Sequence, residues 1–329
     1  MEHSLRHARI LITGGAGFIG SNLVEYSLAR DNEVVALDNF MTGRRDNLAG
    51  YAAHPAFRLL EGDIRDRQLC RRAVDGIDYI LHEAALGSVP RSLRDPVTTT
   101  EVNVSGFVNL LFAAQAAGVK RFVYAASSST YGNSPALPKR EETIGKPLSP
   151  YAITKYVDEL FAANFTELYG IETIGLRYFN VFGRRQDPQG AYAAVVPKFA
   201  AALLQHRPPV INGDGSYSRD FTYIDNVLQA NELALLAECP EALNTVYNIA
   251  GGERTTLLQL FQALRDSLGR FDPAVAAIEP QYGPPRPGDI PHSLADIGKA
   301  RTLLGYRPQF DVQAGLRQAA EWYYRHLAE

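Results

Sequence analysis

The chain has 329 residues and a mass of 36.2 kDa, enough for two domains or for one large domain with a sizeable core. Hydrophobic residues make up 46% of it and charged residues 21%, which excludes a wholly disordered chain. The net charge of −3 and the pI of about 6.2 give no electrostatic reason to expect nucleic-acid binding. Cys70 and Cys239 lie far apart and match no metal-ligand spacing, so we expect neither a disulfide framework nor a metal site. No segment has the apolar length of a membrane span or the pattern of a secretory signal, so we expect a cytoplasmic protein with no membrane partner.

Short apolar strands alternate with helical patterns through the first half of the chain. The expected strands are residues 8–13, 33–37, 57–60, 79–82 and 122–125. The expected helices include residues 18–30 and 103–117. Continuously apolar strands between helices are typical of a parallel sheet covered on both faces, so the fold class is a doubly wound α/β Rossmann fold.

The second half of the chain differs in composition from the first. Stretches rich in proline and glycine at 207–209, 212–215 and 282–288 indicate loops. Helical patterns recur at residues 191–205, 226–237, 256–268 and 312–326. We expect a dinucleotide-binding domain over residues 1–180 and a smaller mixed α/β substrate domain over residues 181–329, some of which crosses back to the first domain. The ligand would then lie between them, at the carboxyl ends of the strands.

A glycine-rich turn follows the first strand and opens the first helix. Its glycines at 14, 17 and 20 allow a tight turn, close approach of a pyrophosphate and close helix–strand packing, respectively. The second strand ends in Asp38, 18 residues after Gly20, where a carboxylate that binds the adenosine ribose is expected. Asp38 favours NAD over NADP because it would repel a 2′-phosphate, although Arg44 and Arg45 could instead bind that phosphate.

A further candidate for this cofactor follows the third strand. Asp63 and Ile64 would flank the adenine, but Asp63 is equally the kind of residue that caps a helix N-terminus.

Tyr151 and Lys155 are four residues apart, which places both on one face of a helix. Alone, such a pair is most often a surface pair. Here it follows a dinucleotide motif and stands 24 residues after Ser127, at the end of a strand. The ammonium of Lys155 and a positive nicotinamide can together make the tyrosine a general base. Ser127 could hydrogen-bond the same substrate hydroxyl, while the roles of Ser128 and Ser129 stay open.

At these motifs the sequence resembles the extended short-chain dehydrogenase/reductases that act on nucleotide sugars. Within them it is similar to the UDP-hexose 4-epimerases, and most of all to the UDP-N-acetylglucosamine 4-epimerases. The resemblance extends over almost the whole chain. Its motifs are Thr13–Gly20, Asp38–Phe40, His82–Ala85, Asn103–Val104, Ser127, Tyr131–Gly132, Tyr151 with Lys155, Arg177–Gly183, Ala85–Ser92, Ala125–Gly132 and His292–Asp296.

The resemblance implies roles for individual residues. Lys155 holds the nicotinamide ribose, and Tyr151 is the base, with Ser127 as its helper. Two arginines clamp the diphosphate, for which a planar guanidinium is well suited. The implied cofactor contacts are Gly14, Gly17, Phe18, Ile19, Asp38, Asn39, Asp63, Ile64, Ala84, Ala85, Asn103, Tyr151, Lys155 and Tyr178. The implied substrate contacts are Ser127, Ser128, Ser129, Asn180 and Ser293, with Asn212 at the uracil and Arg219 and Arg286 at the phosphates.

The segment after Ser127 separates the reactions of this family. Dehydratases carry an acidic pair there and decarboxylases a glutamate, whereas residues 128–131 contain no carboxylate. The resemblance therefore implies C4 epimerisation of UDP-N-acetylglucosamine, and of UDP-glucose, through a transient 4-keto sugar. NAD would be regenerated each turnover and stay tightly bound. Two alternatives stay open: a 4-epimerase of UDP-glucuronate or UDP-N-acetylhexosaminuronate, and an NAD-sensing regulatory protein on the same fold.

Two further expectations come from the resemblance. A homodimer would form through the helices over 103–117 and 151–168, whose apolar residues are Phe107, Leu110, Leu111, Phe161, Phe165 and Leu168. The alternative is that these residues only cover the sheet. Ser293 stands where relatives restricted to non-acetylated sugars tend to hold a tyrosine, so the sugar pocket would admit a 2-acetamido group.

Overall fold

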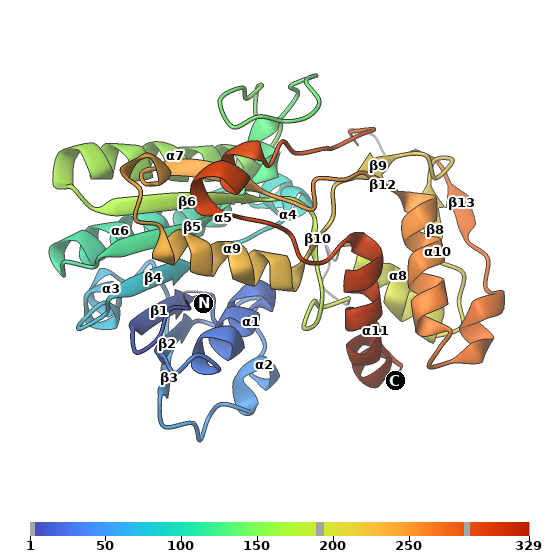
Figure 1. The fold of residues 1–329 in the computed structure, drawn as a ribbon, viewed down its shortest axis with the longest axis horizontal. Coiled ribbons are helices and arrows are strands. Elements are labelled where there is room, and N and C mark those ends of the chain that lie inside the picture. Colours follow the sequence, from blue (N-terminus) through green and yellow to red (C-terminus); the bar gives the residue numbers. More distant parts are fainter. Residues whose placement is uncertain (1–3, 189–193, 286–289, 329) are drawn as a thin grey trace.

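The computed structural model describes residues 4–188, 194–285 and 290–328. A seven-stranded, wholly parallel sheet lies at its centre, in the strand order β11-β6-β5-β4-β1-β2-β3 (Figure 1). The strands are β1 (Arg9–Thr13), β2 (Glu33–Asp38), β3 (Phe57–Glu61), β4 (Tyr79–His82), β5 (Arg121–Ser127), β6 (Glu172–Tyr178) and β11 (Thr245–Ile249). The chain order reverses between β1 and β4, and at such a switch point the strand ends diverge and leave a crevice.

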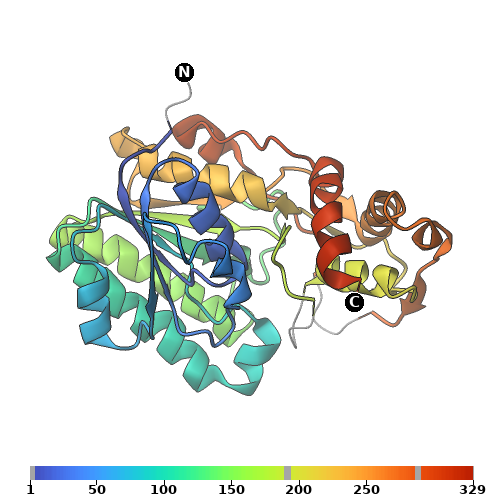
Figure 2. The ribbon, with the colours of Figure 1, turned by 90° about the horizontal axis from the view of Figure 1, so that it is seen from below.

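The side chains of β1 show why the sheet is covered on both faces. Ile10 and Ile12 pack into one apolar cluster and Leu11 into a second one, because successive side chains of a strand point to opposite faces. Helices α1 (Phe18–Leu28) and α9 (Ile224–Leu236) cover the first face; α3 (Arg67–Ala73), α6 (Phe107–Ala116) and α7 (Pro150–Tyr169) cover the second (Figure 2). This arrangement confirms the predicted doubly wound Rossmann fold.

A smaller unit stands beside the sheet, on the right of Figure 1. Its helices α8 (Val195–Leu204), α10 (Leu257–Leu268) and α11 (Val312–Leu327) pack on one another. Three short strand pairs complete it: β7 (Val181–Phe182) with β10 (Thr222–Tyr223), β8 (Val210–Asn212) with β13 (Gln281–Gly283), and β9 (Ser218–Arg219) with β12 (Thr255–Thr256). Its apolar side chains continue the cluster that packs on the first face of the sheet, so the two units share one core.

The chain crosses back from the second half to the large sheet. Helix α9 lies on the sheet, and β11 pairs with β6 at its edge, Asn248 opposite Arg177. The sheet is thus built from both halves of the sequence.

The remaining helical segments are short. They are α2 (Asp46–Ala49), α4 (Val89–Arg94), α5 (Pro96–Thr100), the 3₁₀ turns Ser128–Tyr131, Pro240–Ala242 and Pro273–Ala277, and the π-helical turns Glu101–Gly106 and Ala300–Leu304. The helix predicted over 103–117 is therefore a π-helical turn followed by α6. The helix predicted over 191–205 begins at Val195, and its first residues up to 193 lie outside the described part.

Two further observations concern the chain as a whole. Among the described residues, no helix combines the length and the apolar character needed to cross a membrane. Nor does the described part of the chain hold a group of three or more His, Cys, Asp or Glu side chains that could bind a metal ion.

Candidate active site

The turn between β1 and α1 and the start of α1 require glycine at particular positions. Gly14 has a φ of +67°, and a Cβ there would lie 2.8 Å from the backbone nitrogen of Ala84. A Cβ on Gly20 would lie 2.1 Å from the carbonyl oxygen of Gly14. The N-cap of α1, Gly17, has no side chain to cap the helix, and its first turn contains no acidic residue. The first N–H groups of α1 therefore form a place where an anion such as a pyrophosphate is favoured.

Asp38 closes the neighbouring strand and faces this turn. Its carboxylate accepts N–H bonds from Ala16 (2.9 Å) and Phe40 (2.7 Å), while burial raises its pKa. Its position at the strand end suits a ribose hydroxyl and opposes a 2′-phosphate.

The two arginines that could have held a 2′-phosphate have carboxylate partners of their own. Arg44 Nη1 lies 3.6 Å from Asp187 Oδ2, and Arg45 Nη2 lies 2.6 Å from Glu61 Oε1. The guanidinium of Arg45 also stacks over the ring of Phe40. The side chains around Asp38 thus agree with NAD rather than NADP.

Asp63 follows β3 and lies beside Asn39. It accepts a 2.7 Å bond from Asn39 Nδ2, and its hydrogen bonds with Arg65 lower its pKa to about 2. The alternative interpretation of Asp63 as a helix N-cap is wrong, because Asp66 caps α3 by accepting from Gln68 N and Leu69 N.

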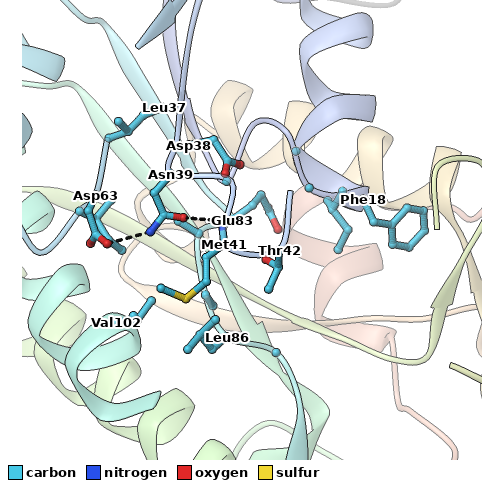
Figure 3. Close-up of a pocket in the computed structure, with 18 of the residues that line it drawn as sticks. Phe18, Leu37, Asp38, Asn39, Met41, Thr42, Asp63, Glu83, Leu86 and Val102 are labelled. Carbon is cyan, nitrogen blue, oxygen red and sulfur yellow. Dashed lines mark hydrogen bonds between the residues drawn. The ribbon is translucent and has the colours of Figure 1, made fainter. Parts of the chain in front are cut away.

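These elements enclose a pocket of about 270 Å³ at the carboxyl ends of β1, β2, β3 and β4 (Figure 3). Ten predicted cofactor residues line it: Gly14, Gly17, Phe18, Ile19, Asp38, Asn39, Asp63, Ile64, Ala84 and Ala85. The other lining residues are Gly20, Leu37, Met41, Thr42, Gly62, Glu83, Leu86, Gly87 and Val102. The glycine cradle, the uncapped helix and Asp38 fit the pyrophosphate and ribose of a dinucleotide.

Sequence reasoning did not single out Glu83, Met41 or Thr42 as pocket residues. A signal existed for Glu83, which is an acidic residue directly after the expected strand 79–82 and before two alanines.

Helix α7 presents Tyr151 and Lys155. The helix begins with Pro150, and Ser149 Oγ accepts from Ala152 N (3.1 Å), which fixes the first turn where Tyr151 lies. Lys155 is 2% exposed; its Nζ donates to Ala125 O (2.8 Å) and lies 3.3 Å from Asp158 Oδ2.

Lys155 stays charged although it is buried. Burial acts to lower its pKa, but the charges of Asp158, Tyr151 and Glu83 raise it above the ordinary value. A cation held there stabilises negative charge on a neighbouring oxygen, which is what a tyrosine base requires.

Ser127 stands at the end of β5. Its Oγ accepts bonds from Ser129 N (3.1 Å) and Ser129 Oγ (2.9 Å). A hydroxyl has two acceptor positions and one donor, so the proton of Ser127 is left to donate elsewhere. Ser128 and Ser129 are half-buried on the following 3₁₀ turn.

Asn103 and Tyr178 lie behind the pocket, outside the set that lines it. Asn103 is 1% exposed; it accepts from Leu86 N (2.8 Å) and donates to Thr154 Oγ1 (3.0 Å), so it ties the pocket loop to α7. The hydroxyl of Tyr178 donates to Glu83 Oε1 (2.8 Å), and burial raises its pKa well above the ordinary value. Direct contact of either residue with the cofactor stays a prediction.

Three of the predicted substrate residues come together around Asp220. Asn180 Nδ2 donates to Asp220 O (2.7 Å), and Asn180 has a φ of +38°. Arg219 Nη1 donates to Ser218 O (3.0 Å) and Pro291 O (3.1 Å), and Ser293 N donates to Ser218 O (3.1 Å). Asn212 lies apart from them on β8, whose partner is β13. Arg286 lies outside the described residues.

Asp220 itself escaped the sequence analysis. It is 0% exposed, and its carboxylate accepts from Gly251 N, Gly252 N and Ala295 N at 2.9 to 3.1 Å. Nothing in the order of residues brings these three segments together, so only the structure could identify it.

Comparison with known proteins places the chain among sugar-nucleotide enzymes. Residues 10–250 match the profile of the NAD dependent epimerase/dehydratase family. A UDP-glucose 4-epimerase of Mycolicibacterium smegmatis is 37% identical over 96% of this chain and 98% of its own. A structure of UDP-N-acetylglucosamine 4-epimerase from Methanobrevibacter ruminantium is 36% identical with a TM-score of 0.90, covering 97% of this chain and 99% of its own. A dTDP-glucose 4,6-dehydratase of Streptomyces venezuelae, solved with NAD, is 34% identical with a TM-score of 0.85, covering 97% of both chains.

Proposed function

Because the chain belongs to the NAD dependent epimerase/dehydratase family, we propose that it inverts the C4 carbon of a UDP-linked hexose, with UDP-N-acetylglucosamine as its principal substrate. The observation that carries the choice of reaction is the composition of the turn after Ser127. Ser128, Ser129, Thr130 and Tyr131 contain no carboxylate, so the acid/base pair that would eliminate water from a 4-keto sugar is missing there.

The residues at the carboxyl end of β5 and on α7 fit the first half of that reaction. Tyr151 removes the proton of the C4 hydroxyl, while Ser127 donates a hydrogen bond to the same oxygen and keeps its own proton. Lys155, fixed by Ala125 O and Asp158, holds positive charge beside them. NAD, held by the Gly14 turn and Asp38, would supply the acceptor for the C4 hydride and the donor that restores it on the opposite face. Tyr151 then gives the proton back to the oxygen, which leaves the protein unchanged.

In this proposal the substrate binds mainly to the smaller unit. We assign residues 1–180 mainly to the dinucleotide and residues 181–329 mainly to the UDP-sugar. Arg219 and Arg286 would hold the diphosphate, Asn180 would contact it, and Asn212 would contact the uracil. Ser293 adjoins Arg219 through the Ser218 backbone, which supports its place beside the sugar. A serine there leaves room for the 2-acetamido group.

We also propose a homodimer through the two predicted helices, α6 and α7, but with other side chains than most of those predicted; of the latter, Leu168 remains exposed. Phe107, Leu110 and Leu111 are 0% exposed and pack against the sheet, so they are unavailable to a partner. The outward faces of α6 and α7 instead expose Phe112, Ile153, Leu160 and Leu168, and the adjoining α4 and α5 expose Leu93 and Val97. Large apolar side chains that are exposed on neighbouring helices are typical of protein interfaces.

The function is tested by incubating the purified protein with UDP-N-acetylglucosamine and no added NAD. Epimerisation yields a C4 epimer of unchanged mass, whereas dehydration removes one water, so mass spectrometry with NMR of the product separates the two reactions. The Tyr151→Phe variant is the matched control. Relative kcat/KM for UDP-glucose, UDP-N-acetylglucosamine and their uronic acids then ranks the substrates. A product lighter by one water would overturn the epimerase proposal. Bound dinucleotide without turnover of any UDP-sugar would support a sensor.

A further inference from the structure

Glu83 is an acidic side chain of the pocket that the proposed reaction does not use. It follows β4 directly, lines the dinucleotide pocket beside Ala84 and Ala85, and accepts the 2.8 Å hydrogen bond from Tyr178. Asn231 Nδ2 on α9 donates to the same tyrosine oxygen (2.9 Å), so the Tyr178 hydroxyl is held with its proton toward Glu83. Within the described chain, no salt bridge neutralises this carboxyl.

The charged and titratable groups around Glu83 come from three other elements. Lys155 on α7 acts on it electrostatically, and Lys155 is itself paired with Asp158 and lies one turn after Tyr151. Tyr178 on β6 stays protonated because burial raises its pKa. His82 on β4 stays neutral because burial, with the charge of Lys155, lowers its pKa to about 3. Burial raises the pKa of Glu83 itself to about 7, against the opposing effects of Tyr178 and Lys155.

Glu83 directly follows His82, which pairs with Tyr124 of β5, so it stands beside the end of β5 that holds Lys155 through Ala125 O. The turn at Gly14 and the carboxylate of Asp38 mark the pyrophosphate and the adenosine ribose. The ring that exchanges hydride would lie near Tyr151, because the proton leaves the C4 hydroxyl oxygen and the hydride leaves the C4 carbon bonded to it. Glu83 accepts the hydrogen bond of Tyr178, and its charge interacts with that of Lys155, which lies one turn after Tyr151.

We propose that Glu83 sets the redox balance of the bound dinucleotide, its carboxylate favouring the oxidised, cationic nicotinamide over the reduced, neutral one. An ionised Glu83 attracts the positive charge of the oxidised nicotinamide. Reduction of the ring removes that positive charge, and protonation of Glu83 removes the negative charge that attracts it. In an epimerase that must return its hydride, such a bias disfavours enzyme left in the reduced state after loss of a keto sugar. The inference shares the dinucleotide site of the proposed function, but it does not depend on the sugar.

The test measures the dissociation constants of NAD⁺ and NADH for the full chain stripped of dinucleotide, by calorimetry. For the wild type, the ratio Kd(NAD⁺)/Kd(NADH) should rise as the pH falls from about 8.5 to about 5.5, because Glu83 takes up a proton. Glu83→Gln keeps an acceptor for Tyr178 but has no charge. At about pH 8.5 its ratio should exceed that of the wild type on the order of tenfold, and at about pH 5.5 the two should agree. Glu33→Gln, an exposed charge deletion on β2, should match the wild type at both pH values.

Two further variants keep the test decisive. Measurements in a Tyr151→Phe background exclude that phenol as the source of any change. Tyr178→Phe removes the donor that favours ionised Glu83, so the pH dependence should persist with its midpoint at higher pH. Equal ratios for wild type and Glu83→Gln at about pH 8.5, or a wild-type ratio that does not vary with pH, would overturn the proposal and leave Glu83 as a structural partner of Tyr178. Because no sugar is present, these outcomes are separate from the turnover assay that decides the proposed function.

Discussion

The ammonium of Lys155 is held from two sides, by a backbone carbonyl at the end of β5 and by Asp158 one turn further along α7. This fixation leaves the lysine no freedom to follow a substrate, so it acts as a fixed charge. In the proposed reaction the proton is transferred by Tyr151, and Ser127 is oriented by the two hydrogen bonds that it accepts from Ser129.

Tyr151→Phe should lose most of the epimerase activity while it still binds UDP and NAD. The ring keeps its packing on α7, but the group that takes the proton is gone, and general base catalysis contributes about 10²–10⁴-fold. Turnover is measured with UDP-N-acetylglucosamine, and binding by calorimetry. Near wild-type turnover would remove Tyr151 from the role.

Ser293→Tyr should reduce kcat/KM for UDP-N-acetylglucosamine about ten- to hundredfold, because overpacking a tight pocket costs typically 1–3 kcal/mol. UDP-glucose, with only a hydroxyl at C2, should be largely spared. The backbone bond from Ser293 to Ser218 survives the change, and Ser293→Ala serves as the control. Equal losses on both sugars would indicate damage to the segment rather than a change in selectivity, and no loss on either would show that Ser293 does not set the width.

At the scale of elements, the strand–turn–helix unit formed by β1 and α1 decides whether the dinucleotide pocket exists. Gly14 packs against the end of β4 and Gly20 against Gly14, so the three segments touch backbone to backbone. Side chains determine little in this contact, which is why its glycine spacing is readable from the sequence.

Gly20→Ala should lower stability by about 1–3 kcal/mol and the dinucleotide content of the purified protein with it. The added Cβ would meet the Gly14 carbonyl oxygen at 2.1 Å, and backbone cannot move aside as a flexible side chain can. Thermal unfolding and the bound dinucleotide released on denaturation are the measurements. Gly50→Ala at the end of α2, with φ −65° and open space around its Cβ, is the matched control and should be neutral or slightly stabilising. A Gly20→Ala protein with full dinucleotide content would contradict this account.

Single helices and strands are what could be predicted best from the sequence. The apolar runs of β1, β2, β4 and β5 and the glycine turn are local signals, and the structure confirms these elements within a few residues. The apolar stripe of Phe107, Leu110 and Leu111 was assigned to an interface, but a stripe at helical spacing indicates only that something covers it. Here that cover is the sheet.

Long-range contacts produced the features that sequence reasoning missed. Asp220 gathers segments near 251 and 295, and Asn248 links Lys139 O with Asp296 O. Glu83 meets its partner Tyr178 only because β4 and β6 both flank β5. Each of these depends on which strands become neighbours, and no local pattern contains that information.

At the scale of the whole molecule, the apolar outer surface of α4 to α7 bears on assembly. We expect a dimer at micromolar concentration, and Leu160→Asp should convert it to a monomer, because a charge in an apolar contact loses its hydration. Light scattering with chromatography measures the mass. Tyr324→Asp, an exposed apolar position on α11, is the control and should remain dimeric. A wild-type monomer would refute the dimer, and a dimeric Leu160→Asp protein would refute this interface.

The return of α9 and β11 to the large sheet has a consequence for anyone who wishes to exchange substrate specificities between relatives. A cut near residue 180 would strip the outermost strand from β6 and uncover the apolar face beneath α9, so a graft of everything downstream carries part of the dinucleotide framework with it. Two segments can be transplanted: the one between residue 180 and Ile224, and the one after Ile249. They must be moved together, because α9 and β11 lie between them in the sequence and belong to the large sheet. We therefore expect chimaeras of two relatives to fold when the exchange uses crossover points on both sides of α9 and β11, and to fail when it uses a single crossover point.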